Sequence, residues 1–273
     1  MATTWFEDYI QANGIRIHYH RAHATDKPSI LLLHGVMDSG LCWPRVAHDL
    51  AGNYDVIMTD ARGHGCSDGI ENGFSLEALA ADAAGVIREL GLQKPYLWGH
   101  SMGAITAAAL ATHYPDLARA IVLEDPPFFQ AIPARANPEQ ESLEAEMWQA
   151  LLAIGALSPE ERLVRARAMN PNWPDEENIP WADSKAEFNP AVLLNASFFM
   201  KPWREALLRV DLPALLVIGD PAQHSIVTPA VAQEVAQTWK DCEVVQISGA
   251  GHNIHRDRYA ETMQSVLDFL NRH

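Results

Sequence analysis

The sequence predicts an α/β fold, in which a mostly parallel, twisted β-sheet is covered by helices on both faces and carries an inserted helical cap. Three observations lead to this prediction. Short apolar runs alternate with stretches of helical periodicity along most of the chain. The apolar runs are nearly continuous, which is typical of strands that are buried on both faces. One segment of roughly 80 residues interrupts the alternation without a clear strand, and it is too long to be a plain loop.

Six segments rich in Val, Ile and Leu, and bounded by Gly, Pro or Asp, are expected to be the buried strands. These segments are residues 29–35, 54–60, 95–100, 119–125, 214–220 and 242–248. Residues 4–11 and 15–22 are joined by Ala-Asn-Gly and are expected to pair as an antiparallel hairpin at the sheet edge. We expect the histidines on or beside this hairpin, His18, His20 and His23, to lie at the surface.

Helical periodicity between the strands predicts the helices that cover the sheet. These are residues 75–90, 102–114, 228–239 and 257–270. Residues 1–127 and 211–273 are expected to form the core of the protein, and residues 128–210 the cap. Two helical patterns lie within the cap, at residues 138–157 and 158–169. We place the cap over the carboxyl-terminal edge of the sheet, because open α/β sheets bind ligands there.

Composition and charge limit the classes of function. Apolar residues make up 48% and charged residues 20% of the 273 residues, so a globular core is expected. The net charge of -15 argues against binding to nucleic acid or to an anionic membrane surface. No segment has the roughly 20 apolar residues of a membrane span, and the N-terminus lacks the pattern of a secretory signal. The expected partner is a small-molecule substrate, bound by a monomer or a homodimer.

The cysteines indicate a reduced environment. The chain has three, Cys42, Cys66 and Cys242, which are far apart and form no Cys-x-x-Cys pair. This usage predicts a cytoplasmic location without a disulfide framework or a structural zinc site.

The segment Gly-His-Ser-Met-Gly (residues 99–103) matches G-x-S-x-G and lies between a predicted strand and a predicted helix. A sharp turn there pushes the Ser101 hydroxyl out above the sheet, and the flanking glycines avoid side chains that would collide. The Met102 N–H then lies at the N-terminus of a helix, where it favours a developing negative charge. A second such donor is expected from the Val36 N–H, because His34-Gly35 ends a buried strand.

A serine hydroxyl is a weak nucleophile until a base removes its proton. His252 is the expected base among the 12 histidines, because it follows a buried strand and a Gly-Ala-Gly turn. This position places it in a loop at the carboxyl-terminal edge of the sheet. His255 lies in the same loop, but a metal site built on the two histidines has no evident third ligand. We therefore expect no metal.

The segments "HGVMDSG", "DARGHGCSD", "GHSMGA" and "GAGH" resemble, in order and position, those of the α/β-hydrolase superfamily. The resemblance covers nearly the whole chain except the cap. It implies Ser101 as nucleophile, His252 as general base and then acid, and the N–H groups of Val36 and Met102 as an oxyanion hole, without metal or organic cofactor. It also implies a structural role for the loop that begins at Asp60-Ala-Arg62.

The carboxylate that orients the histidine is left open by the sequence. Chain order in this fold is serine, acid, histidine. Asp220 follows a strand in the usual region, but His224 occupies the slot that usually holds the acid. Asp125 matches a second location, after the strand that follows the nucleophile helix, where the resemblance to haloalkane dehalogenases and zearalenone lactonases places the acid. Glu124 is adjacent, so Asp125, Asp220 and Glu124 all remain candidates.

A serine nucleophile with an oxyanion hole predicts acyl transfer to water, first of all from a carboxylic ester or a lactone. The alternatives are carbon–carbon bond hydrolysis of dienone acids and a cofactor-free perhydrolase or haloperoxidase. A receptor that binds a small ligand without catalysis is disfavoured by the intact pair of Ser101 and His252.

The aromatic residues of the cap predict a bulky apolar or aromatic substrate, unless they only form the cap's own core. The residues expected to contact substrate are Phe128, Trp181 and Phe199. Other rings of the same segment are Trp148, Trp173, Trp203 and Phe198.

Overall fold

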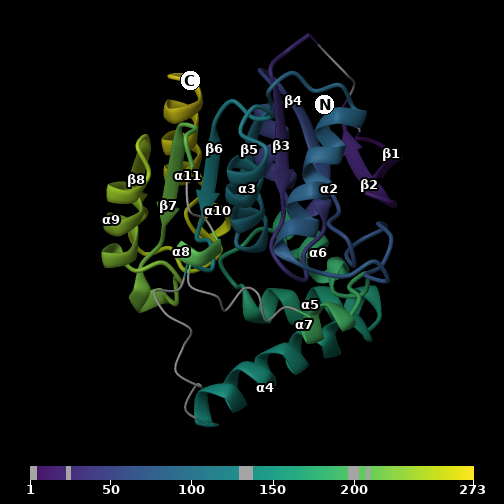
Figure 1. Ribbon diagram of the computed structural model, residues 1–273. Helices are drawn as coiled ribbons and strands as arrows, with labels where there is room; N and C mark the ends of the chain where they lie inside the picture. The colour runs from purple at the N-terminus through teal and green to yellow at the C-terminus, as the bar shows by residue number, and fades with distance from the viewer. Residues whose placement is uncertain (1–4, 23–25, 129–137, 196–202, 207–209) are drawn as a thin grey trace.

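Eight strands of the described residues form one sheet, with the order β1-β2-β4-β3-β5-β6-β7-β8. The computed structural model describes residues 5–22, 26–128, 138–195, 203–206 and 210–273 (Figure 1). Neighbouring strands from β4 to β8 run parallel. The hairpin of β1 and β2 joins them in antiparallel orientation through β4. The predicted α/β class with a mostly parallel sheet is confirmed.

All six apolar segments form strands of this sheet, each slightly shorter than the sequence predicts. The strands are β3 (Ser29–Leu33), β4 (Asp55–Thr59), β5 (Tyr96–His100), β6 (Ile121–Glu124), β7 (Ala214–Ile218) and β8 (Cys242–Gln246). Of the residues trimmed from the predictions, Asp60 and Asp125 directly follow a strand at its carboxyl end, and Asp220 follows β7 after Gly219. Polar side chains at this edge belong to loops. The candidate catalytic residues predicted from the sequence lie in these loops or directly beside them.

Helices cover both faces of the sheet because successive strand residues point to opposite sides. Leu31 and Leu33 pack in the cluster on one side, and Ile30 and Leu32 in the cluster on the other. The first cluster contains residues of α2 (Leu76–Glu89), α3 (Met102–His113) and α9 (Pro229–Thr238). The second contains residues of α1 (Pro44–Leu50) and α11 (Tyr259–Leu270).

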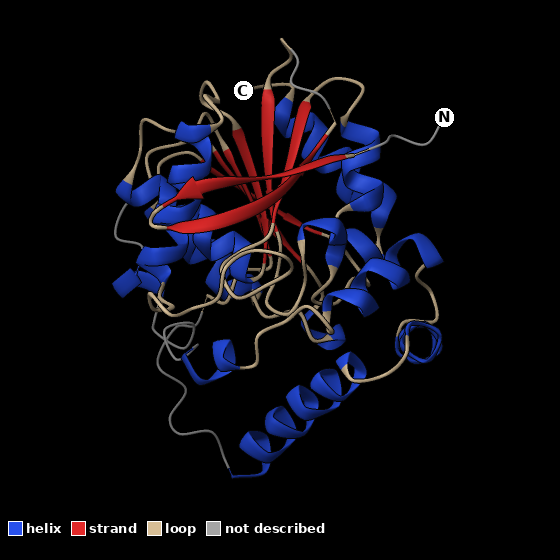
Figure 2. Ribbon diagram, turned by 90° about the vertical axis from the view of Figure 1, so that its right-hand side faces the viewer, coloured by secondary structure: helices blue, strands red, loops and turns tan. Residues whose placement is uncertain are grey.

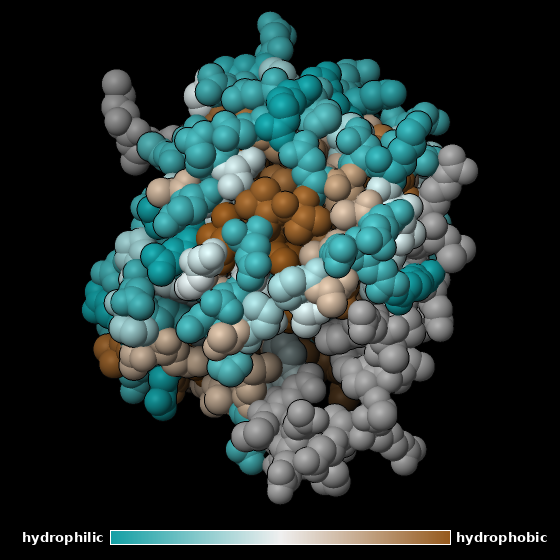
Figure 3. Space-filling view, turned by 90° about the vertical axis from the view of Figure 1, so that its left-hand side faces the viewer, coloured by the Kyte–Doolittle hydropathy of each residue, from teal (hydrophilic) through white to brown (hydrophobic). Residues whose placement is uncertain are grey.

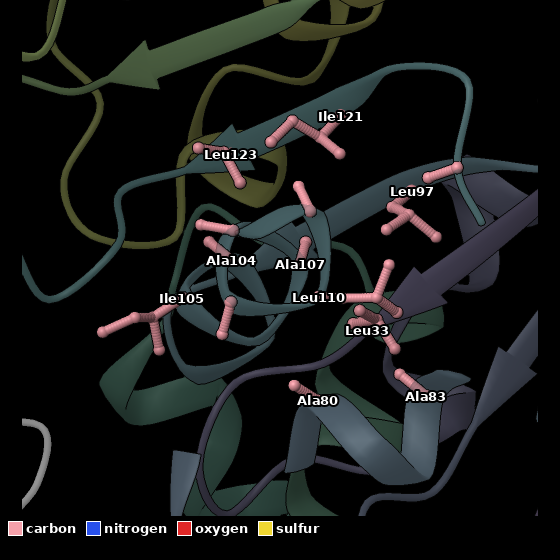
Figure 4. Packing of buried hydrophobic residues seen from close by; sticks show 14 of the residues in the cluster. Leu33, Ala80, Ala83, Leu97, Ala104, Ile105, Ala107, Leu110, Ile121 and Leu123 are labelled. Carbon is pink, nitrogen blue, oxygen red and sulfur yellow. The ribbon is translucent and has the colours of Figure 1, made fainter. Parts of the chain in front are cut away.

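Helix α3 lies at the centre of the first cluster (Figure 4). Its alanines and leucine face the strands and helix α2, and small side chains allow a close approach of helix to sheet. Figure 4 shows Ala104, Ala107 and Leu110 among Leu33, Leu97, Ile121 and Leu123 of the strands and Ala80 and Ala83 of α2. The helix that follows Ser101 is therefore fixed in the core.

The hairpin of β1 (Phe6–Ala12) and β2 (Ile15–Arg21) crosses in front of the remaining strands (Figure 2). The expectation that its histidines lie at the surface is wrong for His18 and His20, which are 3% and 5% exposed. The loop after β4 covers them, since His18 Nδ1 lies 2.8 Å from Asp60 Oδ2. His23 lies outside the described residues.

The segment between β6 and β7 contains five helices and no strand among its described residues. They are α4 (Pro138–Gly155), α5 (Pro159–Met169), α6 (Asp175–Ser184), α7 (Ala191–Asn195) and α8 (Trp203–Ala206). Helices α4 to α7 lie beyond the end of the sheet to which the strand arrows point (Figure 1). The helical patterns at 138–157 and 158–169 correspond to α4 and α5. Helix α6 contains Pro180, which obscures its helical pattern in the sequence.

The loop after β4 is part of the scaffold, as the resemblance implied. Asp60 is 2% exposed and accepts hydrogen bonds from the Gly40 N–H (2.6 Å) and the Cys66 N–H (2.9 Å). Arg62 donates two hydrogen bonds of 2.6 Å to the carboxylate of Asp82 in α2. These buried contacts fix the loop between the hairpin, the sheet and α2.

The opposite end of the sheet is the edge strand β8, on the side of the molecule that Figure 3 faces. A hydrophobic area lies there within a largely hydrophilic surface (Figure 3). Val244 of β8 is 37% exposed. In the part of the chain that the structure describes, no helix combines the length and the apolar character needed to cross a membrane.

Candidate active site

Ser101 is held in a strained turn between β5 and α3. Strand β5 ends at His100 and helix α3 begins at Met102, so the whole change of direction falls on Ser101. Its φ of 51° and ψ of -113° are unfavourable for a residue with a side chain. The Ser101 N–H donates to the Glu124 carbonyl oxygen at 2.9 Å, which keeps the turn in register with β6.

Close backbone contacts explain the two glycines around this turn. A Cβ atom on Gly103 would lie 1.9 Å from the Leu33 carbonyl oxygen. A Cβ atom on Gly99 would lie 2.2 Å from the Gly103 carbonyl oxygen. Both distances are far below van der Waals contact with backbone that cannot move aside. The turn that presents Ser101 therefore requires glycine at both positions.

The expected oxyanion donors lie on two segments that pack against each other. Met102 is the first residue of α3, so its N–H has no acceptor within the helix. The loop after β3 touches the turn: a Cβ atom on Gly35 would lie 2.8 Å from His100 Nδ1 and 3.4 Å from Ser101 Cβ. Val36 follows directly in this loop. The structure thus brings the Val36 segment against the Ser101 turn.

His252 binds a buried carboxylate. Its Nδ1 lies 2.7 Å from Asp125 Oδ2, and an ionised carboxylate only accepts, so Nδ1 donates and Nε2 keeps a lone pair. The His252 side chain is 30% exposed, whereas that of Asp125 is 0% exposed. Within the described residues no hydrogen bond joins Ser101 Oγ to His252. Such bonds often tighten only when substrate binds.

The loop after β7 holds the Asp125 carboxylate from the other side. Asp125 accepts hydrogen bonds from Ser225 Oγ (2.7 Å), the Ile226 N–H (2.8 Å) and the Val227 N–H (2.9 Å). Its own backbone has a φ of 41°, another strained position. With His252 included, four donors fix this carboxylate in one orientation. This loop contains Asp220, one of the candidates for the acid. The loop instead supplies hydrogen-bond donors to Asp125.

Asp220 makes a local contact instead. Its side chain accepts a hydrogen bond of 3.0 Å from the Ala222 N–H and caps a short 3-10 turn. Its own N–H donates to the Ala250 carbonyl oxygen at 2.8 Å. The structure therefore gives Asp220 a role in loop conformation.

Glu124, the remaining candidate, binds a different histidine. Its carboxylate accepts from the His255 N–H (2.9 Å) and from His255 Nδ1 (2.8 Å). Trp98 Nε1 donates to it at 3.3 Å, and the indole of Trp43 stacks on His255 with ring centroids 4.5 Å apart. Burial raises the pKa of Glu124, but attraction to His255 and its hydrogen bonds outweigh burial and lower that pKa to about 2.

His100 connects the Ser101 turn to the histidine loop. Its Nε2 donates to the His252 carbonyl oxygen at 2.9 Å, and the two ring centroids are 4.7 Å apart. Burial, followed by the nearby His252, lowers the pKa of His100 to about 3, so the ring is neutral near pH 7. His100, the residue before Ser101, is therefore in direct contact with His252. The sequence analysis missed this role, although His100 ends the strand beside Ser101.

Apolar side chains of the insertion pack next to the expected oxyanion donors. This cluster contains Met37, Phe74, Leu79, Met102, Phe188 and Val192, with Val36 and Trp148 against it. It joins three parts of the molecule that are distant in sequence: the loop after β3, the Ser101 turn and the inserted helices.

The residues expected to contact substrate have different surroundings. Phe128 is 1% exposed and lies in the main core, stacked on Trp203 and edge-on to Trp239, which directly follows α9, with 5.9 Å between ring centroids in each case. Trp181 is 8% exposed and packs edge-on against Trp173 within the insertion. Phe199 lies outside the described residues. The environments of Phe128 and Trp181 are those of packing residues.

Buried charged residues join the insertion to the loop after β3 and to the segment that follows His252. Lys185 Nζ donates to Asp38 Oδ1 at 3.0 Å, and an Arg256 nitrogen donates to Asp38 Oδ2 at 2.9 Å. Burial raises the pKa of Asp38, but Arg256 and Lys185 outweigh burial and hold that pKa well below its usual range. One ionised carboxylate thus links the loop after β3, the loop after His252 and the end of α6.

Comparisons with known proteins identify the family. The model of the alpha/beta hydrolase family matches residues 30–264, so the chain belongs to this family. N-formylmaleamate deformylase of Pseudomonas putida is 29% identical, over 96% of this chain and 95% of that protein. The 2-(acetamidomethylene)succinate hydrolase of Mesorhizobium japonicum is 28% identical, over 89% and 88%.

A solved structure supports the same assignment. The N-formylmaleamic acid deformylase from Pseudomonas putida S16 superimposes with a TM-score of 0.81 at 25% identity, covering 96% of this chain and 100% of that one. Proteins named as epoxide hydrolases and as a putative esterase/lipase also match. The chain is therefore an enzyme of the alpha/beta hydrolase family, as its sequence motifs predict.

The buried histidines predict how stability depends on pH. Burial lowers the pKa of His34, His64 and His100 below 6.5, so these rings are neutral when folded but take up protons when unfolded. Their contribution is complete above pH 6.5 and is lost as the pH falls below it. We expect the urea midpoint to fall between pH 7 and pH 5, and to fall less steeply in His100→Gln.

The control for this measurement is His113→Gln, which changes an exposed histidine at the end of α3. It should leave the pH profile of the urea midpoint unchanged. A midpoint that stays constant or rises toward pH 5 in the wild type would contradict the proposed burial of neutral rings.

Proposed function

We propose that the protein hydrolyses a carboxylic ester or a lactone through an acyl-enzyme intermediate on Ser101. The observation that carries the proposal is the contact between His252 and the buried Asp125 carboxylate, next to a strained turn that presents a serine. The three residues are in the chain order of a nucleophile–acid–base triad of this fold. We assign Asp125, rather than Asp220 or Glu124, as the acid.

The proposed mechanism assigns a role to each of these groups. Ser101 Oγ attacks the substrate carbonyl carbon while His252 Nε2 removes its proton. Asp125 holds the Nδ1–H of His252 and stabilises the imidazolium that forms. The Met102 and Val36 N–H groups donate to the developing oxyanion. His252 then protonates the leaving alcohol, and a water activated by the same nitrogen releases the acid from Ser101.

The chemistry of the nucleophile favours acyl transfer over epoxide opening. Epoxide hydrolases of this superfamily use an aspartate nucleophile, and this chain has Ser101 in that place. A serine forms an ester with an acyl group that water can hydrolyse, which regenerates the hydroxyl. The relatives named as an esterase and as an enol-lactonase support the same reaction class.

The surroundings support a bulky apolar or aromatic acyl group. The insertion acts as a cap in this proposal, and Phe188 and Val192 bring apolar surface next to Met102. The buried cations at the same loops, Lys185 and Arg256, are both bound to Asp38. Arg256 Nε also lies 3.6 Å from Glu177 Oε2, so two buried carboxylates face these two cations, which makes the cations poor partners for a negatively charged substrate.

A second candidate is hydrolysis of an N-acyl bond in a small molecule. Its support is that two relatives, at 28% and 29% identity over most of their length, are named for a formyl- and an acetamido-bearing compound. Removal of a formyl or acetyl group from nitrogen is also acyl transfer to water, so the same serine chemistry applies.

A substrate panel tests the proposal. Purified protein should hydrolyse 4-nitrophenyl esters and an aromatic lactone, and Ser101→Ala should abolish this activity while leaving the circular dichroism spectrum unchanged. Hydrolysis of N-formyl or N-acetyl enamines without any ester or lactone hydrolysis would favour the second candidate. Activity that survives in Ser101→Ala would contradict both.

The acid assignment has a separate test. Asp125→Asn should lower kcat on the order of 10⁴-fold, because the amide favours the wrong imidazole tautomer. Asp220→Asn is the matched control, and it should retain kcat because the Asp220 side chain accepts its hydrogen bond from the Ala222 N–H of its own loop. The reverse result, in which Asp220→Asn is the inactive variant, would show that the assignment of the acid is wrong.

A further inference from the structure

A second group of potential ligands lies on the hairpin at the sheet edge, away from Ser101. His18 and His20 occupy alternate positions of β2, so their side chains leave the same face of the strand. The β1–β2 register pairs Glu7 with His20, and cross-strand partners lie side by side. The two imidazole rings meet edge to face, with centroids 4.6 Å apart.

The atoms that could bind an ion converge on a single point. Glu7 Oε2 lies 3.8 Å from His18 Nε2 and 3.9 Å from His20 Nδ1. The three ligand atoms all lie within 4.8 Å of one another. Zinc–ligand bonds of about 2.0–2.1 Å place the ligand atoms of a tetrahedral site roughly 3.4 Å apart. The Glu7 side chain is 70% exposed, so its rotation can shorten both of its distances to the imidazole nitrogens.

Asp60 prepares His18 for the role of a ligand. It accepts a hydrogen bond of 2.8 Å from His18 Nδ1, so the proton of the neutral ring is on Nδ1 and the lone pair is on Nε2, the atom that faces Glu7. Asp60 also accepts hydrogen bonds from the Gly40 N–H (2.6 Å) and the Cys66 N–H (2.9 Å), which hold its carboxylate in place behind His18. A carboxylate behind a histidine that faces a metal is a recurrent arrangement in metal sites.

The electrostatic field at the site is negative. The Asp60 carboxylate lies 2.8 Å from His18 Nδ1 and the Glu7 carboxylate lies 3.8 Å from His18 Nε2. Two carboxylates this close to one ring favour a cation beside it. Arg16 and Arg21, the basic residues of β2, bind Asp68 and Asp55 instead. An added cation therefore meets uncompensated negative charge.

We propose that Glu7, His18 and His20 bind one divalent transition-metal ion, and that Zn²⁺ fits this donor set. Two imidazole nitrogens and one carboxylate oxygen are typical zinc ligands, and a water completes four-coordination on the exposed side of Glu7. The sequence predicts no metal site, since the pair of His252 and His255 lacks a third ligand. The ligands proposed here come from two strands, and no compact spacing indicates them. The ion would join β1 to β2 within the hairpin, next to the hydrogen bond from His18 to Asp60.

Metal titration of tag-free, chelator-treated protein tests the site. Calorimetry and elemental analysis should show one Zn²⁺ per chain, and Co²⁺ should give the visible absorption of a tetrahedral site. Glu7→Gln and His20→Gln should each weaken binding by about 10- to 100-fold or more, since even changes behind a ligand cost that much. The thermal melting temperature should rise with Zn²⁺ in the wild type and rise less in these variants.

Two further variants keep the result interpretable. His18→Asn retains an amide that can donate to Asp60 in place of Nδ1 but lacks the Nε2 ligand, so it should fold and lose binding. His48→Gln removes an exposed histidine that also lies beside a carboxylate, that of Asp49, and should bind Zn²⁺ like the wild type. Absence of Zn²⁺ binding in the wild type, or equal binding in all variants, would overturn the proposal.

Discussion

Two adjacent carboxylates at the end of β6 each bind one histidine of the loop that follows β8. Glu124 binds His255 and Asp125 binds His252, and both carboxylates are 0% exposed. The pair of Glu124 and His255 is fully enclosed, so loss of His255 leaves the Glu124 carboxylate buried without its partner, which typically costs about 3–5 kcal/mol. This pair therefore anchors the segment that also carries His252, the partner of Asp125.

The position of Ser101 depends on equally strict backbone packing. Ser101 is placed by a turn in which neither neighbouring glycine can carry a side chain, and its N–H is bonded to β6. The His100 side chain then bonds to the backbone of His252. Ser101, His252 and Asp125 thus come from three loops at the same edge of the sheet, and each loop is bound directly to another. In the proposed mechanism these contacts orient the groups before substrate arrives, which lowers the entropic cost of reaction.

Much of this arrangement could be predicted from the sequence. Continuous apolar runs identify the parallel strands, and G-x-S-x-G at a strand–helix junction identifies Ser101, because both signals are local. The partner of His252 could not be chosen from three carboxylates, because Glu124 and Asp125 differ by one residue and only their spatial contacts separate them. The hydrogen bonds from residues 225–227 to Asp125 could not be predicted either, because only spatial contacts show them.

Other expectations were limited by long-range packing. The histidines of β2 resemble surface residues in sequence, and the loop after β4 buries them only in the folded chain. Phe128 follows the strand as a pocket residue would, yet Trp203 and Trp239 enclose it. Helix α6 is concealed by Pro180, and its charged end is held by Asp38 from a distant loop.

The central claim is that Ser101 is a nucleophile activated by His252 and Asp125. Its most direct test is reaction with an alkyl fluorophosphonate, followed by mass spectrometry of the intact protein and its peptides. We expect one phosphonyl group per chain, located on Ser101, and a much slower reaction when His252 is replaced by alanine. No covalent adduct, or an adduct on another residue, would contradict it.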